Sequence, residues 1–97
     1  MKYVIFWETT PEDMEKCIEK FVKRQQMRNV NPEKYDMHLT TDYSIGGQLK
    51  GLRIVEATPE QVQENVVYWL PELKQKYMPL IEAAKIMEDY MKSKSLT

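Results

Sequence analysis

Three side chains able to do chemistry stand close together in the sequence: His38, Asp42 and Arg53. Histidine changes charge near neutral pH, so His38, the only histidine, could act as a general base or a metal ligand. The guanidinium of Arg53 could hold a carboxylate or phosphate through two parallel hydrogen bonds. A structural alternative stays open, in which Arg53 pairs with Asp42 or with an acid of a partner chain and His38 is a hydrogen-bonded wall residue of a sheet.

No established catalytic motif accompanies these residues. The sequence has no glycine-rich phosphate loop, no HExxH or CxxC pair and no nucleophile elbow. Cys17 is the only cysteine, which excludes an internal disulfide or a cysteine-based zinc site and favours a reducing, cytoplasmic compartment. We expect Cys17 to be a small buried hydrophobic residue. The residues therefore identify no cofactor.

The composition argues against nucleic-acid and membrane partners. The formal net charge of -1 gives no bulk attraction to nucleic acid or to an anionic membrane surface. The segment 50–55 faintly resembles an RNA-recognition strand, but Leu52 and Ile54 stand where bases would stack on aromatic rings. The apolar run Tyr3–Trp7 stops at Glu8, which is shorter than the roughly 7–15 residues of a secretion signal and indicates a strand.

Length and composition indicate one soluble domain over residues 1–97. The chain is 42% hydrophobic and 30% charged, as in ordinary globular proteins. A chain of 97 residues buries only roughly 60–65% of its unfolded surface, so its own core is marginal.

An internal repeat predicts the helices and strands that must position His38, Asp42 and Arg53. ETTPE at residues 8–12 and EATPE at residues 56–60 each follow an apolar run, and Pro59 stands 48 positions after Pro11. In both copies a threonine, a proline and acids form a helix start. Apolar residues then recur at helical spacing, from Met14 to Val22 and from Val62 to Leu70. The chain is therefore predicted to consist of two strand–helix halves.

Each half requires a closing strand. The polar stretch 24–36 is predicted to be a connection. Residues 37–45 alternate with period two, and Gly46-Gly47 predicts a tight hairpin into residues 48–57. Residues 73–81 contain proline and lysines and are predicted to form an edge strand, followed by a helix over 82–92.

The order βαββαβ plus a tail helix predicts an α+β, ferredoxin-like fold: a four-stranded antiparallel sheet with both main helices on one face. The run HLTTDYSIGGQLKGLRIVEATPE, with YVIFWE before it and YMPLIEAAKIMEDY after it, resembles a family of small proteins known only as a domain of unknown function. The resemblance implies a fold related to the dimeric α/β-barrel superfamily, whose members form face-to-face dimers.

The predicted hairpin register divides the sheet residues into two sets. Pairing Ile45 with Gln48 places Thr40 opposite Arg53 and His38 opposite Val55. We expect the helices to cover Val4, Phe6, Leu39, Leu52 and Ile54. We expect the other face to be uncovered and to present Tyr3, Ile5, Trp7, His38, Thr40, Asp42, Arg53 and Val55.

An apolar and aromatic uncovered face predicts a contact surface, and a symmetric homodimer would bury it sheet against sheet. The space between the sheets would then be a pocket for a small ligand. Three functions follow: a dimeric ligand-binding or sensing module, which we favour; a cofactor-independent or haem-using monooxygenase or isomerase of the kind the resemblance implies, with His38 and Arg53 as the acting pair; or an interaction protein for a different partner chain.

Overall fold

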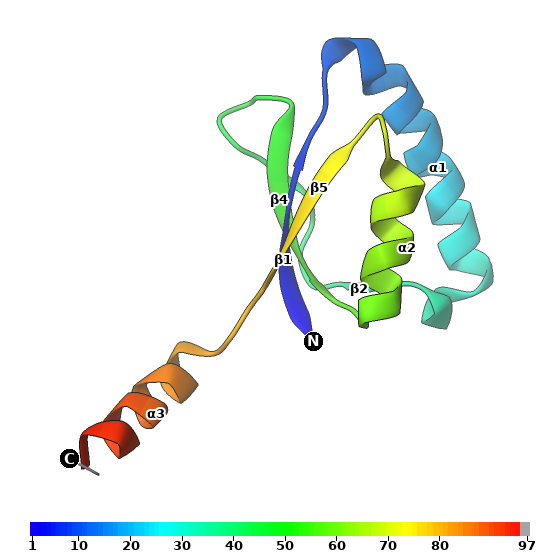
Figure 1. Ribbon diagram of the computed structural model, residues 1–97. Coiled ribbons are helices and arrows are strands. Elements are labelled where there is room, and N and C mark those ends of the chain that lie inside the picture. Colours follow the sequence, from blue (N-terminus) through cyan, green and yellow to red (C-terminus); the bar gives the residue numbers. More distant parts are fainter. Residues whose placement is uncertain (96–97) are drawn as a thin grey trace.

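The structure, a computed structural model, describes residues 1–95 and has an α+β architecture (Figure 1). Two 3₁₀ turns, η1 (Pro11–Asp13) and η2 (Pro32–Lys34), flank the first helix. The remaining elements, in chain order, are β1 (Lys2–Glu8), α1 (Met14–Val30), β2 (Met37–His38), β3 (Tyr43–Ser44), β4 (Lys50–Glu56), α2 (Pro59–Trp69), β5 (Lys74–Pro79) and α3 (Ala83–Ser95).

The strands form one antiparallel sheet in the order β2-β4-β1-β5, and β3 pairs with β4 beyond β2. β1 is central, with Ile5 opposite Arg53 on one side and opposite Tyr77 on the other. β5 is an edge strand, as its proline and lysines predict. Helices α1 and α2 lie on the same side of the sheet (Figure 1).

The prediction of four strands is wrong, because the strand expected over residues 37–45 is divided in two. His38 pairs with Val55, as predicted, but Ser44 pairs with Gly51, which shifts the register by two residues. Residues 39–42 absorb the shift: the backbone N–H groups of Leu39 and Thr40 both donate to the carbonyl of Ile54. Gly46 and Gly47 adopt φ angles of 63° and 70°, and the N–H of Gln48 donates to the carbonyl of Ile45 across them. The N–H of Ile45 donates to Lys50, however, so the predicted pairing of Ile45 with Gln48 is wrong and the loop is longer than two residues. The two-residue shift preserves the face on which each side chain lies.

The predicted assignment of the two sheet faces is also wrong. Ile5 and Val55 have 0% exposure and pack with Val62 of α2, whereas Phe6 is 37% exposed. Strand periodicity separates two sets of residues but does not say which set the helices cover, and here both sets are apolar. We call the uncovered side the open face; it carries Val4, Phe6, Leu52, Ile54, Met78, Lys74 and Lys76.

Helix α1 extends to Val30, so the connection predicted over residues 24–36 is too long. Arg24, in the second half of α1, is buried because other side chains in the interior interact with its charge. Arg24 is only 3% exposed, and its guanidinium lies 4.4 Å from the ring centroids of both Tyr35 and Tyr68. Helix α2 begins at the predicted position, with a capping box of Thr58 and Gln61, and ends at Trp69, two residues before Pro71.

Two apolar clusters form the core between helices and sheet. Ile5, Val55 and Ala57 form one, with Tyr3, Val62 and Tyr77 packed against it. Cys17, Trp69 and Leu73 form the other, against Trp7 and Tyr68. Cys17 is therefore the buried hydrophobic residue that was predicted.

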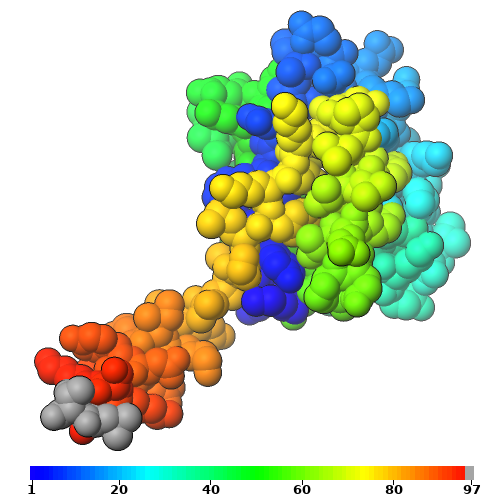
Figure 2. Space-filling model, viewed as in Figure 1, coloured from blue at the N-terminus to red at the C-terminus, as the bar shows by residue number. Residues whose placement is uncertain are grey.

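Helix α3 lies at the end of an arm that projects away from the sheet and the other helices (Figures 1 and 2). All the described residues from Leu80 onward are exposed. The radius of gyration is 16.8 Å, against about 12.5 Å for a compact chain of this length. We call residues 80–95 the arm; the part of the chain that the structure describes leaves its side chains largely exposed.

Candidate functional site

The residues predicted to line a site lie together, but on the helix-covered face. Tyr3, Ile5, Trp7 and Val55 belong to the core clusters under α1 and α2. Arg53 is 5% exposed on the same face. The pocket predicted between two open sheets therefore cannot be lined by these side chains.

Arg53 and Asp42 form one side of a cavity of about 250 Å³ that separates α1 from the sheet. Arg53 Nη1 donates to the carboxylate of Asp42, 3.1 Å from Oδ1 and 3.4 Å from Oδ2. The remaining lining is mostly apolar: Trp7, Thr9, Met14, Cys17, Ile18, Phe21, Trp69 and Leu73. The cavity is an apolar space with one guanidinium at its wall.

The mouth of this cavity is apolar as well. Ile18 and Phe21 of α1 line it and remain 55% and 45% exposed, because α1 does not close onto the sheet at this end. Cys17, from the same helix, is buried at the wall, where its Sγ lies 3.4 Å from Thr9 Oγ1. An apolar molecule entering here would therefore exchange water for contacts with side chains on both layers.

Two buried nitrogen donors on cavity-lining residues lack an acceptor among the described residues: Arg53 Nε and Trp7 Nε1. Buried donors are nearly always hydrogen-bonded, so each represents an uncompensated cost of roughly 1–3 kcal/mol. The side chain of Asp42 is 37% exposed and lies in the irregular segment 39–42, whereas that of Arg53 is 6% exposed. Another molecule can therefore displace Asp42 from this ion pair more easily than it can displace Arg53.

A polar layer that the sequence did not reveal lies next to Arg53. Arg24 donates to both carboxylate oxygens of Glu64 and, at 2.7 Å, to Asn65 Oδ1. Asn65 Nδ2 lies 2.7 Å from the Tyr77 hydroxyl, and burial raises the pKa of Tyr77 to about 12. The signal present in the sequence was the set of arginines at positions 24 and 28, one helical turn apart, which place two guanidiniums on one side of α1.

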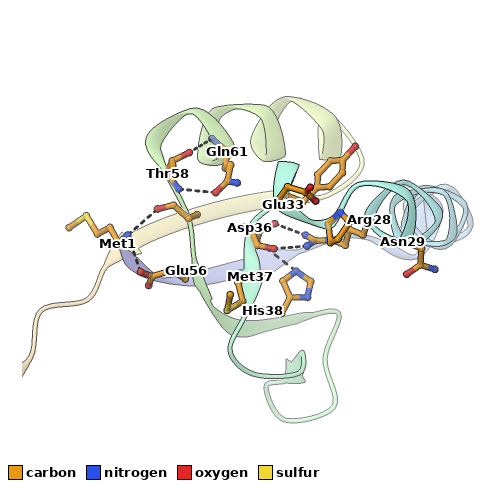
Figure 3. A pocket seen from close by; sticks show the side chains of 13 residues that line it. Met1, Arg28, Asn29, Glu33, Asp36, Met37, His38, Glu56, Thr58 and Gln61 are labelled. Atoms are coloured by element: carbon orange, nitrogen blue, oxygen red, sulfur yellow. Dashed lines mark hydrogen bonds and ion pairs between the residues drawn. The ribbon is translucent and has the colours of Figure 1, made fainter.

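His38 lies at a second, wider pocket of about 620 Å³ near the chain start (Figure 3). Its Nε2 is 3.7 Å from Oδ2 of Asp36, a carboxylate that is 1% exposed. Arg28 holds the other oxygen of Asp36 and also donates to its carbonyl. In Figure 3 the three side chains converge on one wall of the pocket, Arg28 from α1, His38 from β2 and Asp36 from the residue before β2.

Burial lowers the pKa of His38, and the positive charges of Arg53 and Arg28 lower it further. The nearby carboxylates of Asp36 and Asp42 oppose this shift in pKa, but the net effect favours the neutral imidazole. His38 and Arg53 both line a recess of only about 10 Å³ beneath α1, with Arg24 and Arg28. The structure thus brings His38 and Arg53 near each other, but the recess that they share is too small for a ligand. A ligand has room instead in the 250 Å³ cavity beside Arg53 or in the 620 Å³ pocket beside His38.

Thr40 has a backbone role. Its Oγ1 accepts a 3.0 Å hydrogen bond from the N–H of Ile54, which ties the segment 39–42 to β4. Within residues 1–95 no group of three His, Cys, Asp or Glu side chains is placed to hold a metal ion. No helix in that part of the chain is long and apolar enough to cross a membrane.

No protein-family model, curated protein or solved structure matches this chain.

Proposed function

We propose that the protein is a small-molecule-binding or sensing module that takes a small carboxylic acid with an apolar body into the cavity under α1. The observation that carries this proposal is Arg53, a buried guanidinium with an unpaired Nε at the wall of an apolar cavity. A ligand carboxylate accepts hydrogen bonds from such a fork, while the apolar lining takes up the rest of the ligand.

The size of the cavity restricts the ligand. A volume of about 250 Å³ is that of roughly eight water molecules in the liquid, and it lies below the range of about 300–1,000 Å³ typical of drug-sized sites. The aromatic lining from Trp7, Phe21 and Trp69 favours a flat ring. A single aromatic or short branched aliphatic acid fits these limits.

Asp42 occupies the position of the ligand carboxylate in this proposal. Its carboxylate accepts from Arg53 Nη1, and it is exposed enough to turn toward water when a ligand arrives. Replacing one carboxylate by another keeps the buried guanidinium paired, which avoids the cost of an isolated buried charge. Binding would then move the segment 39–42.

The test compares phenylacetate with phenylacetamide, which has the same shape without the charge. We expect the wild-type protein to bind phenylacetate at least about 10-fold more tightly, since a hydrogen bond to a charged group contributes about 1.5–3 kcal/mol. Calorimetry gives the affinities, and amide NMR shifts should be largest in α1 and in residues 39–42. Equal affinity for the two probes, or shifts elsewhere, would refute the proposal.

Three variants sharpen the test. Arg53→Met should abolish the preference for the acid, whereas Lys23→Met, which removes an exposed charge from α1, should preserve it. Asp42→Asn removes the competing carboxylate and should tighten phenylacetate binding. Weaker or unchanged binding by Asp42→Asn would contradict the exchange of carboxylates even if Arg53→Met folds poorly.

The same proposal includes the predictions about the fold, the homodimer and the location of the protein. The order β2-β4-β1-β5, with α1 and α2 on one side, supports a ferredoxin-like arrangement in which β2 and β3 together replace one strand. A relation to the uncharacterised family of dimeric α/β-barrel type, a homodimer and a cytoplasmic location remain proposals. The homodimer now involves the open face, since the face predicted for it is covered by helices.

An enzymatic function is the second candidate, and the pair His38 and Asp36 favours it. A neutral imidazole beside a buried carboxylate, on a pocket of about 620 Å³, can accept a proton from a bound substrate. Turnover found with any substrate should then fall by about 100-fold or more in His38→Gln while the fold is kept. Activity retained in that variant would eliminate the role.

A further inference from the structure

The open face and the arm are two apolar surfaces that remain exposed among residues 1–95. On the open face Phe6 and Met78 remain 37% and 44% exposed. Among the described residues of the arm, six large apolar side chains are each between 40% and 66% exposed: Leu80, Ile81, Ile86, Met87, Tyr90 and Met91. Contiguous exposed apolar surface of this extent marks a contact site.

Helix α3 is amphipathic in a way that specifies a docking side. Ile86, Met87, Tyr90 and Met91 recur at helical spacing and form one stripe, while Lys85 and Lys92 lie opposite. A helix of 13 residues is only marginally stable alone in water. The helix therefore needs an apolar surface on which to pack.

Its own sheet is not within reach in the structure. The N–H of Leu80 donates to the carbonyl of Lys2, which fixes the end of β5, and only two residues separate Leu80 from α3. The arm consequently leaves the body at the end of the sheet and points outward (Figure 2).

We propose that the occupant of the open face is a second copy of this chain: in a symmetric dimer, the arm of each copy lies with its apolar stripe on the open face of the other. Helix α3 is about 20 Å long at 1.5 Å per residue, and β1 and β4, of seven residues each, span about 23 Å. One arm thus matches the length of the sheet it covers.

The buried area supports this arrangement over simpler ones. At roughly 100 Å² for each half-exposed large side chain, one arm and one open face bury on the order of 1,000 Å² between them, and two reciprocal contacts bury about 2,000 Å². A stable interface requires about 1,200–2,000 Å². Pairing α3 with α3, or sheet with sheet, would leave the other apolar surface in water.

The charges are complementary as well. Glu88 and Asp89 border the apolar stripe, three residues before Met91 and three after Ile86. The open face carries Lys74 and Lys76 on the edge strand β5, opposite Glu8 and Phe6 of β1. Acids along the helix therefore meet lysines beside the apolar centre of the sheet.

Light scattering of the full chain tests the dimer. We expect a dimer for the wild type and a monomer for Met87→Glu and for Met78→Glu, which change the arm and the open face separately. Lys85→Glu, on the opposite side of α3, should remain dimeric. A wild-type monomer, or dissociation by only one of the two surface variants, would overturn the proposal.

Cross-linking distinguishes the modes of pairing. In a Cys17→Ala background, one batch carries Met87→Cys and another Met78→Cys, and a bismaleimide is added to each batch and to their mixture. The arm-on-sheet dimer predicts a cross-link between chains in the mixture only. Links within the Met87→Cys batch would show paired helices, links within the Met78→Cys batch would show paired sheets, and either alone would refute the proposal.

Discussion

Arg24 Nη2 donates a 2.7 Å hydrogen bond to Asn65 Oδ1, and this bond joins α1 to α2 in the buried layer beside the sheet. Asn65 is 1% exposed and also bonds Tyr77 of β5. One carboxamide therefore connects three elements. It provides the polar partner that the inward guanidinium of Arg24 needs in addition to Glu64.

Asn65→Leu should lower the free energy of unfolding by about 2–5 kcal/mol, because it keeps the volume but leaves the Tyr77 hydroxyl without its partner and takes one of two acceptors from the buried guanidinium of Arg24. Urea denaturation measures the change. Asn29→Leu, the same substitution at an exposed position of α1, should cost less than about 0.5 kcal/mol. A loss below about 1 kcal/mol in Asn65→Leu would mean that water or a rearranged side chain replaces the amide.

The single histidine gives a direct pH test. The C2 proton of His38 should titrate in NMR with a pKa below the ordinary value of about 6.5, since burial and two guanidiniums disfavour its charged form. Arg53→Met should move this pKa upward, whereas Asp36→Asn should move it further down. A wild-type value at or above 6.5 would contradict the placement of His38.

The same shift has a consequence for stability. Because the pKa of His38 is lower in the folded state, the unfolded chain binds more protons, and the contribution of His38 to stability is lost as the pH falls from about 7 through the folded-state pKa. We expect the free energy of unfolding to fall less steeply with acidification in His38→Gln than in the wild type. Parallel pH profiles would argue against this linkage.

Gly51 is predicted to tolerate no side chain. A Cβ there would lie 2.0 Å from the carbonyl oxygen of Tyr43 and 2.4 Å from the ring of Trp7, and neither the backbone nor a packed indole can yield that far. Gly51→Ala should therefore cost about 3 kcal/mol or more in urea denaturation. Gly47→Ala, where φ is +70° but space is open, should cost about 1 kcal/mol. Equal losses of unfolding free energy in Gly51→Ala and Gly47→Ala would show that the strands at Gly51 separate easily to accommodate a methyl group.

The two threonines that begin the repeated helices, Thr10 and Thr58, should contribute differently to the free energy of unfolding. Thr58 accepts the N–H of Gln61 in a complete capping box, whereas Thr10 makes no cap hydrogen bond and instead donates to Asp13 Oδ2. Thr58→Ala should cost about 1 kcal/mol of unfolding free energy, and Thr10→Ala less than about half of that. The two melting curves, compared with the wild type, check the order.

The sequence alone determined the order of the main elements, because each depends on local chemistry. Thr58, Pro59 and Gln61 start α2 by satisfying the first helical N–H groups, and Gly46-Gly47 supplies the positive φ angles that the turn needs. The predicted pairing of His38 with Val55 is confirmed only because two deviations cancel: Ile45 bonds Lys50 instead of pairing with Gln48, and segment 39–42 takes up the resulting shift of two residues. The division into β2 and β3 did not follow, since it depends on how Leu39 and Thr40 bond to Ile54.

Only the tertiary structure decided which side of the sheet is covered. Ile5 and Phe6 are equally suited to a core, so alternation separates them without ranking them. Contacts between residues distant in sequence determine which set the helices cover. Asn65 bonds Tyr77, Arg53 bonds Asp42, and Val62 packs on Ile5 and Val55. These contacts place His38 and Arg53 beneath α1 and leave Phe6 outside, because a buried polar group must lie on the side where another element can bond it.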